Sequence, residues 1–224
     1  MVINMKKIMI ALVFFGVACS DNNPAPGPGA CADIQCRERA ACCQRPLLGA
    51  MLPDMRVDAY YQGKVQKIHL KKYTGKWLIL FFYPSDFTFV CPTELKELSD
   101  YYQEFTALDA EIVSISTDSV FVHRAWKKEN ENLKNIRYPM VSDRSGSLSR
   151  QLGAFNPEQG LAERATFLVS PEGRIVAYEF HHESIGRSAD ELLRKLAAAQ
   201  AVRNGTGGYC PAGWKPGEEV IHAE

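Results

Sequence analysis

A run of seven apolar residues at positions 77–83 places the strongest constraint on the fold of this chain. A run of this kind is typical of a central strand whose sheet is covered on both faces. Pro84 ends the run, and a turn follows. The apolar residues that then recur at helical spacing are Leu95, Leu98, Tyr102 and Phe105. This spacing predicts an amphipathic helix over residues 88–106, with Cys91 and Pro92 in its first turn.

The rest of the chain alternates between strand-like and helix-like segments. The further strands are predicted over residues 111–117, 165–169 and 174–178, and the further helices over residues 123–132 and 188–202. The turn residues at 170–173 join two of the strands into a hairpin. This order predicts an α/β sandwich of thioredoxin-like type, with a central mixed sheet flanked by helices. We place this domain at residues 48–203 and a C-terminal tail at residues 204–224.

Length and charge narrow the class of protein. A chain of 224 residues with 46% hydrophobic composition is long enough for one compact domain and short for two. Lys and Arg balance Asp and Glu, and no basic run is present in the sequence. Nucleic-acid binding therefore has no electrostatic support.

The N-terminus is typical of an export signal. Lys6 and Lys7 precede a short apolar segment at residues 8–18, which is too short for a bilayer span but fits a signal peptide over residues 1–18. Cys19 then lies where a bacterial lipoprotein is cleaved and acylated. The region 19–47 contains a Pro- and Gly-rich stretch typical of a tether. We predict a membrane-anchored exported lipoprotein; the alternative is a cytoplasmic protein whose start codon has been placed too early.

The seven cysteines are distributed unevenly. Five precede residue 44, and of these Cys31, Cys36, Cys42 and Cys43 lack the paired spacing and the nearby histidine of a zinc site. Local disulfides or free thiols explain them better. Only Cys91 and Cys210 belong to the rest of the chain, so these two are the candidates for thiol chemistry.

A nucleophilic cysteine must be ionised, whereas an ordinary thiol with a pKa of about 8.5 is only a few per cent thiolate at pH 7. The first turn of a helix supplies unpaired N–H groups and partial positive charge at Cys91, and a nearby guanidinium would supply more. The Thr88 hydroxyl is placed to bind a peroxide oxygen, and Pro84 to shield the sulfur from water.

Three segments carry a resemblance to a known family. Pro84-Ser85-Asp86-Phe87-Thr88-Phe89-Val90-Cys91-Pro92-Thr93-Glu94 resembles the active-site motif of the peroxiredoxins. Gly160-Leu161-Ala162-Glu163-Arg164-Ala165-Thr166-Phe167 resembles the segment that holds their active-site arginine, which assigns that role to Arg164. Tyr209-Cys210-Pro211-Ala212-Gly213-Trp214 resembles their second cysteine motif. The resemblance extends over residues 49–219 and is strongest to the peroxidase subunit of bacterial alkyl hydroperoxide reductase.

The resemblance implies a thiol peroxidase that needs no metal, haem or bound flavin. Cys91 would attack hydrogen peroxide or an alkyl hydroperoxide and become a sulfenic acid, and Cys210 of the second subunit of a homodimer would close a disulfide on it. An external dithiol, either a thioredoxin-like protein or a flavoprotein reductase, would reopen this disulfide. The family also forms rings of dimers, so a decamer is possible by analogy.

Two departures from the family pattern concern overoxidation. Residues 130–133 are Asn-Glu-Asn-Leu where sensitive members carry Gly-Gly-Leu-Gly, and the chain has no Tyr-Phe tail. Both departures predict an enzyme that resists overoxidation.

Other interpretations of these residues remain open at this stage. Cys91 fits an inert buried thiol, Arg164 a surface ion pair, Thr88 a helix cap, Pro84 a strand terminator and Cys210 an ordinary exposed cysteine. Glu94 fits either a local hydrogen-bond network or a solvated helix face. A disulfide reductase would need a second cysteine in C-x-x-C, and Cys91-Pro92-Thr93-Glu94 lacks it. A holdase chaperone ring is the alternative from a different functional class.

Overall fold

The structure, a computed structural model, describes residues 47–205 and 207–223. Cys19, the cysteines at 31, 36, 42 and 43, the signal segment and nearly all of the tether lie outside these residues. The strands are β1 (Arg56–Tyr61), β2 (Lys64–His69), β3 (Trp77–Phe82), β4 (Ala110–Ser116), β5 (Met140–Ser142), β6 (Phe155–Asn156), β7 (Leu161–Ala162), β8 (Arg164–Val169) and β9 (Ile175–His181). The α-helices are α2 (Cys91–Asp100), α3 (Tyr102–Ala107), α4 (Val120–Glu129), α5 (Ser147–Gln151) and α6 (Ala189–Arg203), and the short 3-10 turns are η1 (Leu70–Tyr73) and η2 (Glu131–Leu133).

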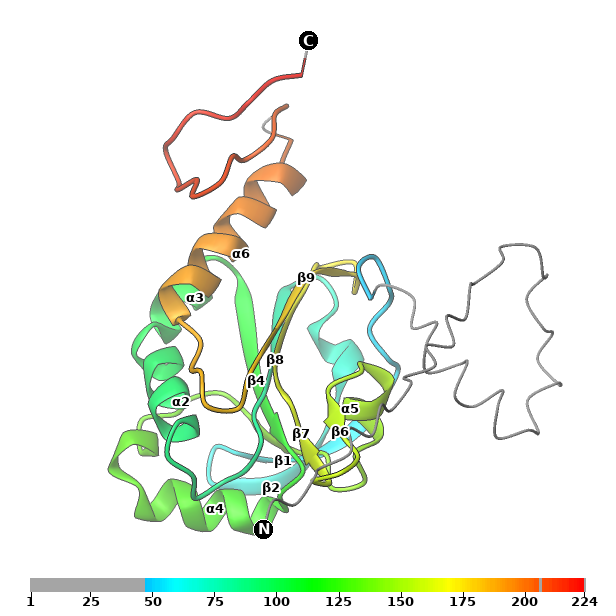
Figure 1. The fold of residues 1–224 in the computed structure, drawn as a ribbon, viewed down its shortest axis with the longest axis vertical. Helices are drawn as coiled ribbons and strands as arrows, with labels where there is room; N and C mark the ends of the chain where they lie inside the picture. The colour runs from blue at the N-terminus through cyan, green and yellow to red at the C-terminus, as the bar shows by residue number, and fades with distance from the viewer. Residues whose placement is uncertain (1–46, 206, 224) are drawn as a thin grey trace, which may run out of the picture. The chain divides into compact units, whose positions relative to one another are not determined.

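Seven strands form one mixed sheet in the order β2-β1-β5-β4-β3-β8-β9. The pairs β3–β4 and β4–β5 are parallel, and the remaining neighbours are antiparallel. Parallel neighbours need crossover connections, which α2 with α3 and α4 provide. Figure 1 shows the sheet between these helices on one side and α5 with the β6–β7 pair on the other. The predicted sandwich with a central mixed sheet is confirmed.

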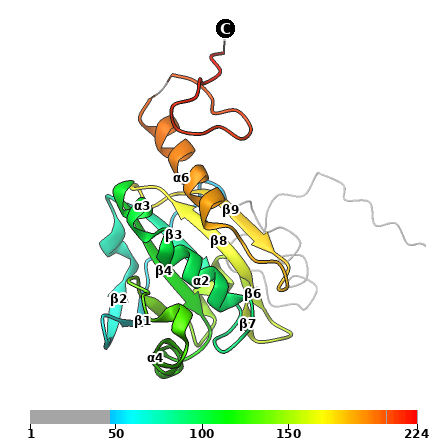
Figure 2. The same cartoon turned by 90° about the vertical axis from the view of Figure 1, so that its left-hand side faces the viewer.

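The central strand divides the core into two layers. Every residue of β3 is buried. Leu78, Leu80 and Phe82 pack on the side of α5, and Trp77 and Ile79 pack on the side of α2 and α6, as the two-residue period of a strand requires. Figure 2 shows α2, α3 and α6 lying in front of the sheet. Cys91 belongs to this second layer.

Several boundaries differ from the expectation. The helix predicted over residues 88–106 begins at Cys91 and is interrupted at Tyr101, which separates α2 from α3. The backbone of Phe87 has φ of 56°, a region that bulky residues rarely adopt. Residues 87–90 therefore form part of a loop and not the first turn of the helix.

Among the described residues, no helix is both long enough and apolar enough to cross a bilayer.

Candidate functional site

Cys91 is the first residue of α2 and follows the loop that leaves β3. Val90 precedes the helix and makes no side-chain hydrogen bond to its first turn. The N–H groups of Thr93 and Glu94 donate to the Val90 oxygen, whereas the Cys91 N–H has no intrahelical acceptor. Pro92 occupies a position where an N–H would have no intrahelical partner. The predicted place of Cys91 in the first turn is confirmed. Its side chain is fully buried, so the sulfur lies away from bulk water.

The guanidinium of Arg164 lies beside this sulfur. Nη1 and Nη2 are 3.7 and 3.8 Å from Cys91 Sγ. Arg164 is the first residue of β8 and is 3% exposed, which excludes the surface ion pair. Nη2 and Nε also donate to the backbone oxygen of Glu183 at 2.6 and 3.2 Å. These bonds fix the plane of the guanidinium so that two of its nitrogens, Nη1 and Nη2, lie near the sulfur.

Glu94 joins Arg164 to a second buried arginine. Its carboxylate pairs with Arg164 and accepts hydrogen bonds from Arg187 Nε at 3.0 Å and Nη2 at 3.2 Å. Arg187 also stacks on the Phe81 ring, with 3.4 Å between guanidinium carbon and ring centroid. Burial lowers the pKa of Arg187, and its hydrogen bonds with Glu94 oppose that shift. Glu94 is 3% exposed, so the solvated-face interpretation is wrong.

The charges of this buried cluster are unequal. Arg164 and Arg187 carry two positive charges, and Glu94 supplies one negative charge. The cluster therefore places one net positive charge beside Cys91 Sγ, where it stabilises negative charge that develops in a reaction.

Thr88 and Pro84 lie in the loop before Cys91, and both are half-buried. Thr88 Oγ1 donates to the backbone oxygen of Ser85 at 2.9 Å. Because its proton is committed there, this oxygen is left as an acceptor, suited to the O–H of a peroxide. Thr88 does not cap α2, since Val90 occupies the N-cap position. Pro84 follows β3, and its shielding of the sulfur stays a prediction.

A buried polar network holds the same loop in place. Asp86 Oδ2 lies 2.7 Å from His123 Nδ1, and Asp86 Oδ1 accepts from the Tyr83 hydroxyl at 2.8 Å. His123 Nε2 faces the backbone oxygen of Val141 at 3.1 Å. Burial raises the pKa of Asp86, and the hydrogen bond to His123 opposes that shift. The network therefore packs α4 against the loop and does not reach Cys91.

Cys210 lies far from Cys91 within one chain. Its Sγ is 3.8 Å from the backbone oxygen of Ala198, toward the end of α6. The N–H of Arg187, just before α6, donates to Glu94 beside Cys91. Eleven residues of mostly helical chain between positions 187 and 198 span about 16 Å. A disulfide requires Cα atoms within about 7 Å, and Figure 1 shows the tail beyond the far end of α6.

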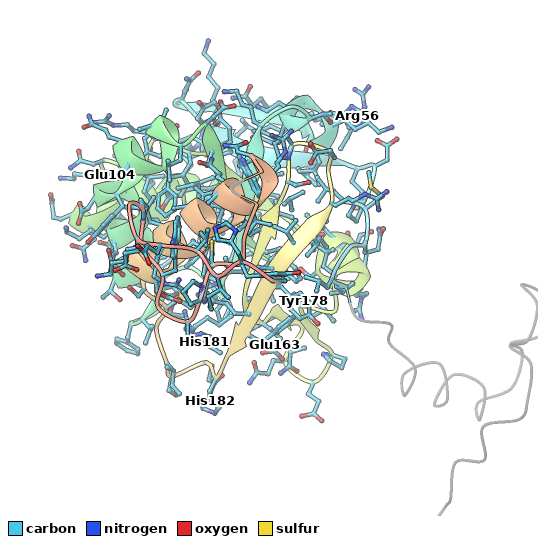
Figure 3. The ribbon with its side chains drawn as sticks, turned by 90° about the horizontal axis from the view of Figure 1, so that it is seen from above. Arg56, Glu104, Glu163, Tyr178, His181 and His182 are labelled. Carbon is cyan, nitrogen blue, oxygen red and sulfur yellow. The ribbon has the colours of Figure 1, made fainter. Side chains whose placement is uncertain are left out.

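The structure thus brings Cys91, Arg164 and Glu94 together, with Thr88 and Pro84 in the adjoining loop. Arg187 is the buried residue whose importance the sequence analysis missed. The adjacent histidines His181 and His182 are labelled in Figure 3. His181 is the last residue of β9, and His182 follows the strand. The described residues hold no group of three potential metal ligands among His, Cys, Asp and Glu.

Two family models match this chain. The model of the AhpC/TSA family matches residues 48–178, which is more than half of the chain. The model of the C-terminal domain of 1-Cys peroxiredoxin matches residues 198–224. The first match includes Cys91 and Arg164, and the second includes Cys210.

Proteins that are similar to this chain in sequence are named as alkyl hydroperoxide reductases or peroxiredoxins. Alkyl hydroperoxide reductase C of Escherichia coli K12 is 42% identical over 175 residues, covering 78% of this chain and 94% of the relative. The chloroplastic 2-Cys peroxiredoxin BAS1 of Hordeum vulgare is 44% identical over 180 residues, covering 79% of this chain and 85% of the relative.

Solved structures of proteins with such names are similar to this chain in fold. The crystal structure of Enterococcus faecalis AhpC matches with a TM-score of 0.72 at 43% identity, covering 75% of this chain and all of that chain. Reduced 2-Cys peroxiredoxin of Plasmodium vivax matches with a TM-score of 0.75 at 30% identity, covering 79% and 93%. The predicted thioredoxin-like fold and the predicted family are both confirmed. The chain therefore belongs to the AhpC/TSA family and is a peroxiredoxin, a thiol-dependent peroxidase.

Proposed function

We propose that Cys91 is the peroxide-reducing nucleophile and that Cys210 of the second subunit resolves its sulfenic acid. The observation that supports this assignment best is the Arg164 guanidinium 3.7 Å from Cys91 Sγ at the first residue of a helix. The Cys91 thiolate attacks one peroxide oxygen, the O–O bond breaks, and water or an alcohol leaves. Arg164 stabilises the charge that develops on the leaving oxygen, and Thr88 accepts the hydrogen bond of the incoming peroxide. Pro84 shields the thiolate from water.

Cys210 has a separate and testable part in this cycle. In Cys210→Ser, we expect one peroxide to be reduced for each Cys91, because the first step does not use Cys210. Turnover with a thioredoxin system should then fall to a few per cent of the parental rate, and the disulfide-linked dimer should be absent from non-reducing gels. Parental turnover in this variant would contradict the assignment.

Within one subunit, Arg187 near Cys91 and Ala198 near Cys210 are separated by about 16 Å along α6, which favours a disulfide between subunits. Cys91 is also enclosed, so the first turn of α2 must open before the two sulfurs meet. The proposed cycle therefore alternates between a folded active site that reduces peroxide and an opened one that carries the disulfide.

We propose a homodimer formed through β9, with dimers able to assemble into a decameric ring. Strand β9 is one edge of the sheet and has Val176, Tyr178 and Phe180 exposed on one face; Figure 3 labels Tyr178 on this strand. An apolar edge without proline is a template for pairing with a second copy. A ring would cover Phe89, which is 94% exposed near the active-site loop.

Charge at this edge should break the dimer. We expect Phe180→Lys to sediment mainly as a monomer at micromolar concentration, because it places a desolvated cation in the pairing surface. The matched control is Val65→Lys on β2, the opposite edge, where the side chain is 44% exposed. Sedimentation velocity distinguishes them. Equal dissociation of both variants, or of neither, would contradict an interface at β9.

The holdase alternative is not favoured, because the similar proteins are named as peroxiredoxins and alkyl hydroperoxide reductases. The double variant Cys91→Ser, Cys210→Ser separates the two roles. It should lose peroxide reduction, and a holdase would still protect an aggregating client protein.

We further propose that residues 1–18 are an export signal and that Cys19 is acylated, so that an exported dithiol carrier serves as reductant. The support is the charged and apolar N-terminal pattern of the sequence. Labelling the native organism with an alkyne fatty acid should mark the parent in the membrane fraction and leave Cys19→Ser unlabelled. An unlabelled, cytosolic parent would contradict export and favour a cytosolic flavoprotein or thioredoxin as the reductant.

A further inference from the structure

The C-terminal tail is a closed loop with its own fixed structure. The backbones of Tyr209 and Ile221 exchange hydrogen bonds of 2.7 and 2.9 Å, which bring the two ends of the loop together. Gly208 lies so close to Val220 that a Cβ would meet its side chain at 2.6 Å. Trp214 is buried, and its Nε1 donates to the backbone oxygen of Glu218 at 3.1 Å. Cys210 therefore belongs to an ordered loop and not to a free end.

One side chain of α6 attaches this loop to the domain. Arg194 Nη1 donates to the backbone oxygen of Trp214 at 3.1 Å. Its Nε and Nη2 donate to Glu191 at 2.7 and 2.9 Å, which holds the guanidinium in position from its other edge. Arg194 thus bridges the folded domain and the loop that carries Cys210.

Arg194 is also a neighbour of the Cys210 thiol. Cys210 Sγ lies 3.8 Å from the backbone oxygen of Ala198, which is one helical turn after Arg194 on the same face of α6. Arg194, Ala198 and Cys210 line one groove. The pKa of Arg194 is raised, mainly by its hydrogen bond to Glu191. The same side chain therefore holds the loop and lines the groove that also contains Cys210.

We propose that Arg194 is a positioning residue for the resolving step. This inference rests on the proposed role of Cys210. In that step the Cys210 thiolate attacks the sulfenic sulfur of Cys91, an S–S bond forms and the S–O bond breaks. The hydroxide that leaves takes up the proton given by the Cys210 thiol and becomes water. The Cys91 sulfur is reduced, and the Cys210 sulfur is oxidised. Arg194 contributes by keeping the Cys210 loop in one position and by placing a positive charge near its thiol.

The expected effect is confined to one step of the cycle. In Arg194→Met the loop loses the hydrogen bond that α6 donates to the backbone oxygen of Trp214, and misplacement of a reacting group by about 1 Å can slow a reaction by about a hundredfold. We expect disulfide formation to slow by about tenfold to a hundredfold, while sulfenic acid formation at Cys91 keeps its parental rate. At high peroxide, the longer-lived sulfenic acid should be converted to sulfinic acid more often.

The experiment uses the full-length reduced protein. Rapid-quench mass spectrometry after mixing with hydrogen peroxide gives separate rates for sulfenic acid and disulfide formation. Arg203→Met is the matched control, because Arg203 lies on the same helix and lines the same groove but hydrogen-bonds to Glu172. Arg194→Lys keeps the positive charge, so it should recover part of the lost rate.

The outcomes separate this inference from the proposed function. A slow disulfide step in Arg194→Met, with partial recovery in Arg194→Lys and a parental rate in Arg203→Met, supports the proposal. A parental disulfide rate in Arg194→Met overturns it, as does an equal loss in Arg203→Met or a matching loss in the sulfenic acid step. If Cys210→Ser turns over peroxide with a thioredoxin system at the parental rate, the proposed role of Cys210 has failed, independently of Arg194.

Discussion

Replacement of Cys91 by serine is expected to abolish peroxide reduction, lowering the second-order rate constant by about four orders of magnitude or more. A serine hydroxyl is almost wholly un-ionised at neutral pH, and the carboxylate of Glu94 is engaged by Arg164 and Arg187, which makes it a weak base for activating the hydroxyl. The two arginines and Glu94 would remain, so the loss would isolate the contribution of the sulfur. Stopped-flow consumption of hydrogen peroxide at pH 7 measures this rate constant directly.

Two controls make the Cys91→Ser result specific. The circular dichroism spectrum and the melting temperature of Cys91→Ser should be close to those of the parent, because serine replaces the sulfur atom with an only modestly smaller oxygen atom. Cys210→Ser should still consume one equivalent of peroxide. Peroxide reduction by Cys91→Ser at the parental rate would exclude Cys91 as the nucleophile.

The sequence best predicts those elements whose own pattern of apolar residues shows that they are buried. The apolar run at 77–83 became the fully buried strand β3, and α6 differs from its predicted bounds by one residue at each end. By contrast, β2 is exposed at four of its six residues, so it has little apolar periodicity. The feature that indicates this strand is the two-residue turn before it, at Gln62 and Gly63, which both have positive φ.

The active site shows the same division between local and long-range information. A contiguous motif contains Cys91 and Thr88, so the sequence alone places them near each other. The approach of Arg187 to Glu94 joins residues that are 93 positions apart. This contact depends on how the segment before α6 passes the start of α2, and no local pattern encodes it. The family resemblance placed Arg164, but its 3.7 Å distance from the sulfur required the folded chain.

Replacement of Arg164 by methionine is expected to lower the second-order rate constant for peroxide by about a hundredfold to a thousandfold, or about 3–4 kcal/mol in the activation barrier. The guanidinium faces the sulfur with two nitrogens at 3.7 and 3.8 Å, so its removal takes away the nearest positive charge. It also removes the donors that would stabilise the leaving oxygen. The reaction of Cys91 with hydrogen peroxide, followed by stopped flow, measures this loss.

The buried pair with Glu94 complicates this variant, because removing one partner of a buried ion pair costs about 3–5 kcal/mol of folding stability. Arg164→Lys retains a positive charge and should unfold at a higher temperature than Arg164→Met, yet it lacks the planar pair of donors. We therefore expect Arg164→Lys to remain at least tenfold slower than the parent. The matched control is Arg150→Met, whose guanidinium stacks on Phe155 and contacts neither Cys91 nor Glu94. If Arg164→Met folds and reacts at the parental rate, the charge beside the sulfur is not what activates it.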